Sequence, residues 1–260
     1  IHLAARVGVT GGWDEYERVN VDGTALLIDE ARHAGVGAFV HVSSPSVAHS
    51  GAPLIGAGAD PAEPDATRGH YATTKAMAEV LALDATSPAM PIVAIRPHLV
   101  WGPGDTQLVA RVVARARQGR LVLVGSGAAL IDTTYIDNAA DALVAAVDRA
   151  PHLGGRALVV SNGEPRTVHE LVLRMVDAAG VDWSSRHVPA ALAIGGGAVV
   201  ERVWDRSGRI DDPPMTSFLA EQHSTAHWFD QRETRTSLRW EPAVSIAEGF
   251  DRLASWFAEQ

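Results

Sequence analysis

The chain has 260 residues, of which 47% are hydrophobic and 20% are charged, a composition typical of globular rather than disordered proteins. Its formal charge is −9 and it contains no basic run, so we expect no nucleic-acid partner. The absence of cysteine excludes disulfides, thiolate metal sites and a cysteine nucleophile, and it fits a reducing cytoplasm.

The first half of the chain alternates apolar strands with amphipathic helices. Residues 1–4 are predicted to form a short buried strand, and residues 13–34 one long helix that ends before Gly35. After them we expect a fully buried strand over 38–42, a loop over 51–69, a helix over 70–83, a strand over 92–95 and a loop over 96–105. This alternation predicts a parallel sheet that binds ligands at the carboxyl ends of its strands.

Beyond residue 105 the predicted elements become shorter. We expect helices over 108–118, 138–148, 167–179 and 245–257, and strands over 121–124, 133–136 and 157–160. Asp137 is predicted to cap the second of these helices and Thr167 the third. The fold class is therefore α/β, with a Rossmann-like, doubly wound sheet over residues 1–105. Residues 106–260 are expected to form mainly a smaller substrate lobe, with some segments that return to the sheet.

The most apolar window, residues 188–200, is too short to cross a membrane, because a spanning helix needs roughly 18–20 apolar residues. We interpret it as a helix or lid over an apolar pocket, with peripheral membrane contact as the alternative.

Tyr71 and Lys75 are the residues around which a site is predicted. Because they are four positions apart on a helix they share one face, where the ammonium can favour ionisation of the phenol, whose ordinary pKa is about 10. The same spacing is also common on amphipathic surfaces. Ser44 favours the catalytic interpretation, since it stands at the end of a strand where it and Tyr71 can reach one substrate oxygen. The histidine spacing matches no metal motif, and we expect no metal site.

Three motifs occur in the same order as in a known family: Ser43-Ser44 after a strand, Tyr71-x-x-x-Lys75, and Arg96-Pro97-x-x-x-Trp101-Gly-Pro-Gly-Asp. With them the chain resembles the extended short-chain dehydrogenase/reductase family over essentially its whole length. It is most similar to the 3β-hydroxysteroid dehydrogenase branch, which includes bacterial reductases of 2-alkyl-3-oxoalkanoates. The blocks at 134–141 and 161–165 and the run Pro213-Pro214-Met215-Thr216 carry that finer similarity.

The resemblance implies NAD or NADP as cofactor and a role for each matching residue. Tyr71 would exchange a proton with the substrate oxygen, Lys75 would lower the pKa of Tyr71 and hold the nicotinamide ribose, and Ser44 would hydrogen-bond the reacting oxygen. The cofactor would be bordered by Ala4, Ala5, Arg6, Asn20, Ser43, Pro97, His98 and Val100. The helices over 13–34 and 70–83 match those that form a four-helix homodimer interface in this family.

Some of these residues also have ordinary structural interpretations. Asn20 could be a solvated helix residue, His98 a loop histidine satisfied by backbone groups, and Trp101 a packing residue. Each alternative stays open at the level of the sequence.

The chain departs from the family pattern in two places. The Gly-rich fingerprint that seats the pyrophosphate is absent and the first residue is Ile1, so we expect roughly 60 residues of leading βαβ structure upstream, and the choice between NAD and NADP cannot be read. Ile131 stands before Asp132, where nucleotide-sugar members often carry arginine. This second departure favours a small hydrophobic substrate.

The predicted function is an NAD(P)-dependent oxidoreductase that interconverts a secondary alcohol and a ketone on a steroid-like or 3-oxoacyl lipid. The alternatives are a nucleotide-sugar epimerase or dehydratase, and a truncated, non-catalytic binding protein.

Overall fold

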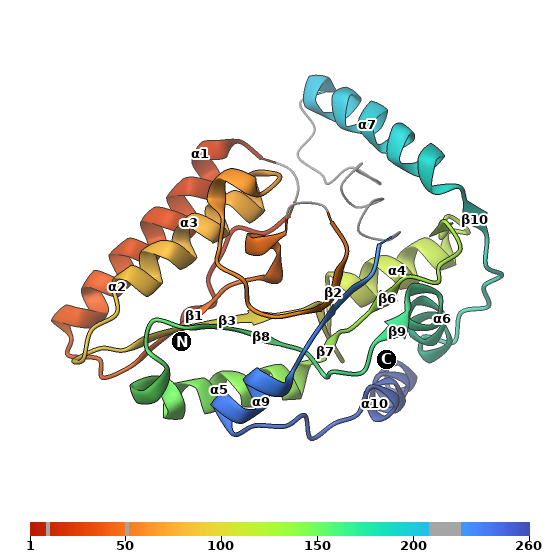
Figure 1. Ribbon diagram of the computed structural model, residues 1–260. Coiled ribbons are helices and arrows are strands. Elements are labelled where there is room, and N and C mark those ends of the chain that lie inside the picture. Colours follow the sequence, from red (N-terminus) through yellow and green to blue (C-terminus); the bar gives the residue numbers. More distant parts are fainter. Residues whose placement is uncertain (9–10, 50–51, 208–224) are drawn as a thin grey trace.

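A three-stranded parallel sheet forms the centre of the computed structural model, which describes residues 1–8, 11–49, 52–207 and 225–260. Its strands are β1 (Phe39–Val42), β3 (Ile92–Pro97) and β8 (Ala157–Val160), in the order β1-β3-β8. Helices α2 (Gly23–His33) and α3 (His70–Asp84) cover one face and α5 (Ile136–Leu153) covers the other (Figure 1). The predicted parallel α/β sheet is confirmed.

Both faces of this sheet are buried, which explains why its strands are almost continuously apolar. Phe39 and Ile92 pack with Ile28 of α2 on one face, while Val40 and Ile95 join a cluster with α5 on the other. Because β8 pairs with β3, a segment from the second half of the chain completes the sheet begun by the first.

The predicted strand over residues 1–4 is wrong. His2 alone forms a parallel bridge, to His41, in which its N–H donates to Val40 O and its carbonyl accepts from Val42 N. Ile1 and Leu3 are 54% and 62% exposed. A single bridge orders the segment beside β1 without burying these apolar side chains.

The predicted helix over 13–34 forms as one continuous helix with an expanded middle. The segments α1 (Trp13–Tyr16), a π-helix (Glu17–Asp22) and α2 follow one another without leaving helical backbone angles. Gly35 ends it with φ +69°, a conformation that glycine adopts without strain. The π turn contains Asn20, and such turns are frequent at functional sites.

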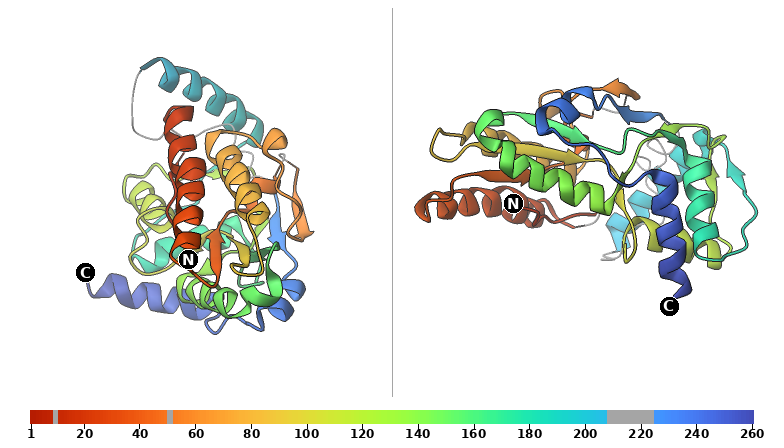
Figure 2. Two further views of the ribbon diagram at one scale, coloured as in Figure 1. Left: turned by 90° about the vertical axis from the view of Figure 1, so that its left-hand side faces the viewer. Right: turned by 90° about the horizontal axis from the view of Figure 1, so that it is seen from below.

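The second half builds a lobe on three predicted helices, α4 (Leu108–Arg117), α6 (Val168–Ala178) and α10 (Ile246–Ala258). They surround a core that includes Trp101, Tyr135 and Phe250. Thr167 caps α6 and Ser245 caps α10, each accepting a bond from the backbone N–H three residues on. Figure 2 shows α10 beside α6, at the end of the molecule opposite α2.

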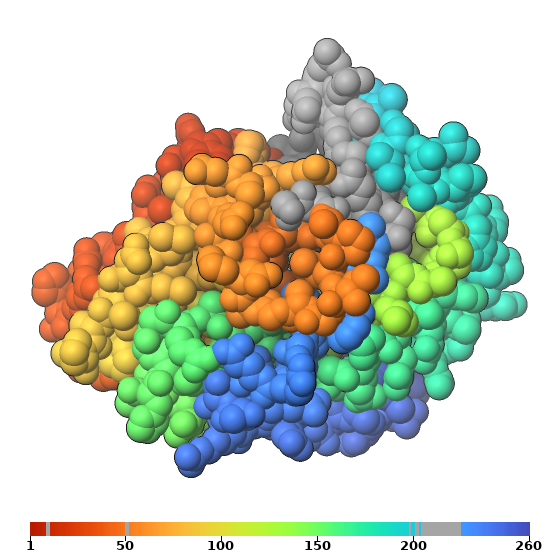
Figure 3. Space-filling view, in the orientation of Figure 1, coloured from red at the N-terminus to blue at the C-terminus, as the bar shows by residue number. Residues whose placement is uncertain are grey.

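Small sheets connect this lobe to the centre. Four strands pair in the order β2 (Leu54–Ala57), β11 (His227–Phe229), β6 (Leu130–Ile131) and β9 (Arg166–Thr167). Two further pairs are β4 (Val100–Trp101) with β7 (Thr134–Tyr135), and β5 (Leu123–Val124) with β10 (His187–Val188). The predicted loop over 51–69 is therefore wrong at β2, which forms because β11 supplies a partner far along the chain; Figure 3 shows the two segments side by side.

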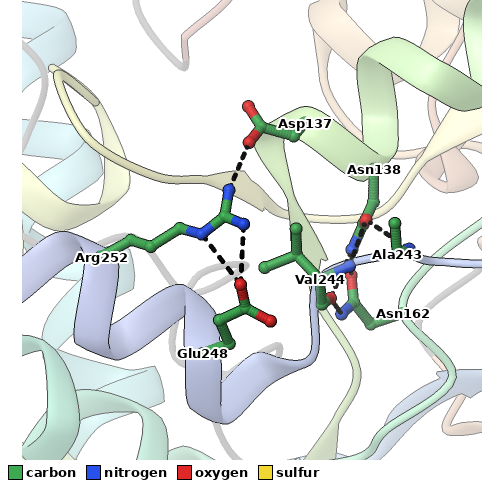
Figure 4. Close-up of polar contacts among 7 residues, drawn as sticks. All are labelled: Asp137, Asn138, Asn162, Ala243, Val244, Glu248 and Arg252. Atoms are coloured by element: carbon green, nitrogen blue, oxygen red, sulfur yellow. Dashed lines mark hydrogen bonds and ion pairs between the residues drawn. The ribbon is translucent and has the colours of Figure 1, made fainter.

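Asp137 is not the predicted helix cap. Helix α5 begins at Ile136, two residues before the predicted start, with Tyr135 as its N-cap, and the Asp137 carboxylate pairs with Arg252 of α10 at 2.9 Å (Figure 4). The neighbouring Asn138 is buried and accepts the backbone N–H groups of Ala243 and Val244, both at 3.0 Å. The first turn of α5 thus holds the segment that leads into α10.

The apolar window over residues 188–200 begins at the end of β10 and continues in helix α7 (Ala190–Ser207), and α9 (Arg232–Leu238) follows β11. Among the described residues no helix is long and apolar enough to cross a membrane. The Pro213-Pro214-Met215-Thr216 run lies outside the described residues.

Candidate active site

Ser44 and Tyr71 meet at the carboxyl end of β1. Ser44 follows the strand and caps a short 3₁₀ helix (Pro45–Ala48), where its Oγ accepts the Ser46 N–H at 3.3 Å. Tyr71 lies in the first turn of α3, which packs against that 3₁₀ helix, and its phenol hydrogen-bonds with Ser44. The two predicted site residues are therefore brought together, although 27 positions separate them in the sequence.

Lys75 is the single lysine of the chain and is 3% exposed. Its ammonium donates to the carbonyl of Val42 at 2.6 Å, at the end of β1. Burial lowers the pKa of Lys75 to about 8, against the opposing influence of the Glu79 carboxylate. At neutral pH Lys75 is therefore mostly charged, with a pKa only slightly above the pH of the solution.

Burial raises the pKa of the Tyr71 phenol, and the hydrogen bond with Ser44 partly offsets that effect. The sequence led us to expect Lys75 to act on this pKa, whereas in the structure desolvation is the largest influence. The phenol is consequently protonated at neutral pH, the form that can donate a proton.

Asn20 is buried rather than solvated. Its Oδ1 accepts the Arg6 N–H at 2.7 Å, and its Nδ2 donates to Arg6 O at 3.1 Å and to Thr74 Oγ1 at 3.0 Å. One side chain thus ties the loop with Ala4, Ala5 and Arg6 to the helix that carries Tyr71 and Lys75. These contacts place the predicted cofactor-bordering loop, while its contact with a cofactor remains a prediction.

Helix α3 is also anchored by a buried ion pair. The guanidinium of Arg96 on β3 contacts both carboxylate oxygens of Glu79, at 2.5 and 2.9 Å, and donates to Asp60 O at 2.7 Å. Both side chains are at most 1% exposed. Because the pair joins α3 to β3, it fixes the helix against the sheet edge.

Ser43 is buried and its side chain does not join the site contacts. Its backbone N–H extends the ladder to Ile95 O at 2.7 Å, but its Oγ has no hydrogen-bond partner among the described residues. Trp101 is a packing residue, stacked on Phe250 with ring centroids 4.4 Å apart and donating to Thr133.

Pro97 ends β3, and His98 follows it with a partner that the sequence did not suggest. Its Nδ1 lies 2.7 Å from Oδ1 of Asp132, so a carboxylate rather than the backbone satisfies this nitrogen. Asp132 is fully buried, and its Oδ2 accepts from Ser161 Oγ at 2.7 Å and Phe229 N at 3.0 Å. Asp132 and Ser161 were missed as site residues, although each is a polar residue directly after an apolar strand.

The turn after His98 is conformationally strained. Leu99 has φ +41°, a region that costs a non-glycine residue roughly 1–2 kcal/mol. Thr134 holds the turn, its N–H donating to Leu99 O at 3.3 Å and its Oγ1 to His98 O at 2.8 Å, while Val100 continues into β4. Pro97, His98 and Val100 therefore form one braced edge beside β1.

The chain matches known proteins over most of its length. The 3-beta hydroxysteroid dehydrogenase/isomerase family profile matches residues 1–190. A 2-alkyl-3-oxoalkanoate reductase of Stenotrophomonas maltophilia is 43% identical over 258 residues, covering 97% of this chain and 78% of that protein. A decarboxylating sterol-4-alpha-carboxylate 3-dehydrogenase of Schizosaccharomyces pombe is 30% identical, covering 94% and 73%.

Solved structures share the fold at lower identity. A UDP-glucuronic acid 4-epimerase from Bacillus cereus in complex with NAD aligns with a TM-score of 0.72 at 20% identity, covering 99% of this chain and 73% of that chain. The RMD structure from Pseudomonas aeruginosa, complexed with NADPH, aligns with a TM-score of 0.68 at 19% identity, covering 100% and 80%. At these identities the likeness shows a common Rossmann-like architecture.

Proposed function

Because the chain belongs to the 3-beta hydroxysteroid dehydrogenase/isomerase family, we propose that it is an NAD(P)-dependent oxidoreductase that reduces the 3-keto group of a 2-alkyl-3-oxoalkanoate-like lipid. The observation that carries the proposal is the convergence of Ser44, Tyr71 and Lys75 at the end of β1. Its substrate class follows the relative that is 43% identical. Both named relatives act on compounds with a carboxylate on the carbon next to the reacting one, as their names state.

The nicotinamide end of a dinucleotide fits the residues at this edge. An ammonium has three N–H donors, and among the described residues Lys75 uses one, on Val42 O. The remaining donors suit the hydroxyls of a ribose. The sequence contains no Gly-rich strand–turn–helix fingerprint of the kind that binds a pyrophosphate. The residues of this site would therefore contact the nicotinamide end of the dinucleotide.

Each site residue has one task in the proposed reaction. A reduced nicotinamide held beside Lys75 would supply the hydride that the carbonyl carbon needs. Tyr71 donates its proton to the carbonyl oxygen, while Ser44 donates a hydrogen bond to the same oxygen. The Lys75 ammonium stabilises the phenolate that Tyr71 becomes, and Asn20 keeps the loop at residues 4–6 beside it.

A hydrophobic substrate agrees with the residues at β6. Ile131 is 6% exposed and belongs to the core of the second lobe, whereas Leu130 is 41% exposed. Neither residue offers a charge to a diphosphate. We therefore prefer a lipid over a sugar nucleotide.

The test is oxidation of NADH or NADPH with a 2-alkyl-3-oxoalkanoate, for wild type, Tyr71→Phe and Tyr135→Phe. We expect Tyr71→Phe to lower kcat at least about 100-fold, because loss of a general acid commonly has an effect of that size. Tyr135→Phe, a change in the second lobe, serves as the matched control. Equal activity of Tyr71→Phe and wild type would disprove the assignment, and turnover of UDP-sugars instead would favour an epimerase.

We also propose a homodimer built on α2 and α3. Leu26 and Leu27 of α2 are 64% and 42% exposed, and Val80 of α3 is 38% exposed. Pairing these helices with a second copy would remove the apolar side chains from water. Leu26→Asp should then shift the mass in analytical ultracentrifugation from dimer to monomer, and an unchanged dimer would place the interface elsewhere.

Helix α7 presents Leu192, Val199 and Val203, which are 67%, 57% and 54% exposed. Their spacing of seven and four residues places them on one helical face. We propose this face as a cover for the lipid chains of the substrate, with peripheral contact to a membrane as the alternative. Co-sedimentation with lipid vesicles distinguishes the two roles.

A further inference from the structure

His98 is held so that one ring nitrogen is anchored and the other is open. Its Nδ1 is bonded to Asp132, and among the described residues no partner is found for Nε2. The side chain keeps 13% of its surface exposed, whereas the Asp132 carboxylate that faces Nδ1 is 0% exposed.

Asp132 orients His98 and does not itself reach a ligand. Its two oxygens accept from His98, Ser161 and the backbone N–H of Phe229, and the side chain is 0% exposed. The carboxylate oxygen that faces Nδ1 is an acceptor, so the contact favours an Nδ1–H that donates to Asp132. In either protonation state the ring position is fixed, and in the charged state Nε2–H is a donor to anions.

The open nitrogen belongs to the same sheet edge as the Ser44–Tyr71 pair. Val42 of β1 is level with Ile95 of β3, so Ser44 is level with Pro97 and His98 stands one residue further. Neighbouring strands are about 4.8 Å apart with a rise of about 3.3 Å per residue, which puts the Cα atoms of Ser44 and His98 roughly 6 Å apart. The β1–β3 ladder extends as far as Ser43, whose N–H donates to Ile95 O, and the β3–β8 ladder reaches His98, whose N–H donates to Val160 O.

We propose that His98 is a binding site for the carboxylate of the substrate, with Asp132 as its positioning residue. The inference rests on the proposed function, because in a 3-oxo acid a single carbon separates the carboxylate from the ketone carbon. A substrate whose ketone oxygen meets Ser44 and Tyr71 therefore carries its carboxylate within reach of the adjacent strand end. The strained turn at Leu99, braced by Thr134, gives this anchor a fixed position.

The test compares a 2-alkyl-3-oxoalkanoic acid with its methyl ester, which keeps the ketone and removes the charge. The variants are His98→Asn, whose amide can still donate to Asp132, and His98→Phe, which keeps a ring without nitrogens. His152→Asn, an exposed histidine on α5, is the control. We expect kcat/KM for the acid to fall about 10- to 100-fold in both His98 variants, the range of a hydrogen bond to a charged group, while the ester changes much less.

An equal loss for acid and ester would overturn the anchor and leave His98 a structural residue. A wild-type protein that reduces the ester as well as the acid would also overturn it. If wild type reduces neither compound, the proposed function fails, and calorimetric titration of the 3-hydroxy acid and its ester then decides the anchor separately. Tighter binding of the acid, lost in His98→Asn, supports the anchor, and equal binding of the two compounds refutes it.

Discussion

Replacing Lys75 by methionine should stabilise the cofactor-free protein while removing its activity. Lys75 is 3% exposed, and burial lowers the pKa of its ammonium from an ordinary 10.5 to about 8, so the charged form is disfavoured. That difference is equivalent to about 3 kcal/mol, since one pKa unit is about 1.4 kcal/mol. Losing the hydrogen bond to Val42 O lowers the free energy of unfolding by about 1 kcal/mol. We therefore expect Lys75→Met to gain about 2 kcal/mol in free energy of unfolding at pH 7.

The lowered pKa of Lys75 also determines how the stability of the wild-type protein changes with pH. Below pH 8 Lys75 is charged in both the folded and the unfolded state, so the full penalty is present. Between pH 8 and 10.5 the unfolded state binds more protons, so wild-type stability rises with pH; above 10.5 the penalty is gone. Lys75→Met should lack this rise. Urea unfolding of both proteins between pH 7 and 9.5 measures the difference.

A direct titration is available because the chain has one lysine. Reductive ¹³C-methylation labels only Lys75 and the terminal amine, so NMR can follow its ionisation without assignment of other lysines. A Lys75 signal that titrates near 10.5, or a Lys75→Met protein that is less stable at pH 7, would refute the reasoning. Activity of the variant should be at least about 100-fold lower, as expected when an acid–base site loses its charge partner.

The buried ion pair predicts that Arg96→Met lowers the free energy of unfolding by about 3–5 kcal/mol, because Glu79 is left charged and unpaired; adding Glu79→Leu should recover most of it in urea unfolding. Asn20→Ala removes three hydrogen bonds and should lower stability by about 2–3 kcal/mol, and an unchanged urea midpoint would contradict its bracing role. Gly249→Ala would place a Cβ 2.8 Å from a ring carbon of Tyr135, so thermal unfolding should show a loss of about 1–3 kcal/mol.

Local pattern was sufficient for the regular elements and for the centre of the site. Strands such as 92–95 are short and apolar throughout, and the helices at 70–83 and 245–257 have clear boundaries, so periodicity and capping identified them. Tyr71 and Lys75 share a helix face by their spacing alone. Ser44 could be added because parallel strands bring their carboxyl ends to one edge.

Elements that depend on a distant partner were missed. β2 exists because β11, more than 170 residues later, pairs with it, and neither segment has a strong strand pattern of its own. Asp137 looked like a cap because caps are judged from neighbouring residues, whereas its partner, Arg252, comes from α10. Residues 1–4 have an apolar sequence but pair only at His2.

The sequence by itself determined the parallel α/β class, the strands at 38–42 and 92–95 and the shared helix face of Tyr71 and Lys75, since these follow from spacing and apolar pattern along single elements. Only the tertiary structure decided that His98 hydrogen-bonds with Asp132 and that Asn20 holds the loop at Arg6. It also decided that burial is the largest influence on the pKa of Tyr71. Hydrogen-bond partners 34 residues apart and the depth of a side chain below the surface depend on how complete elements pack. No local pattern of residues records that packing.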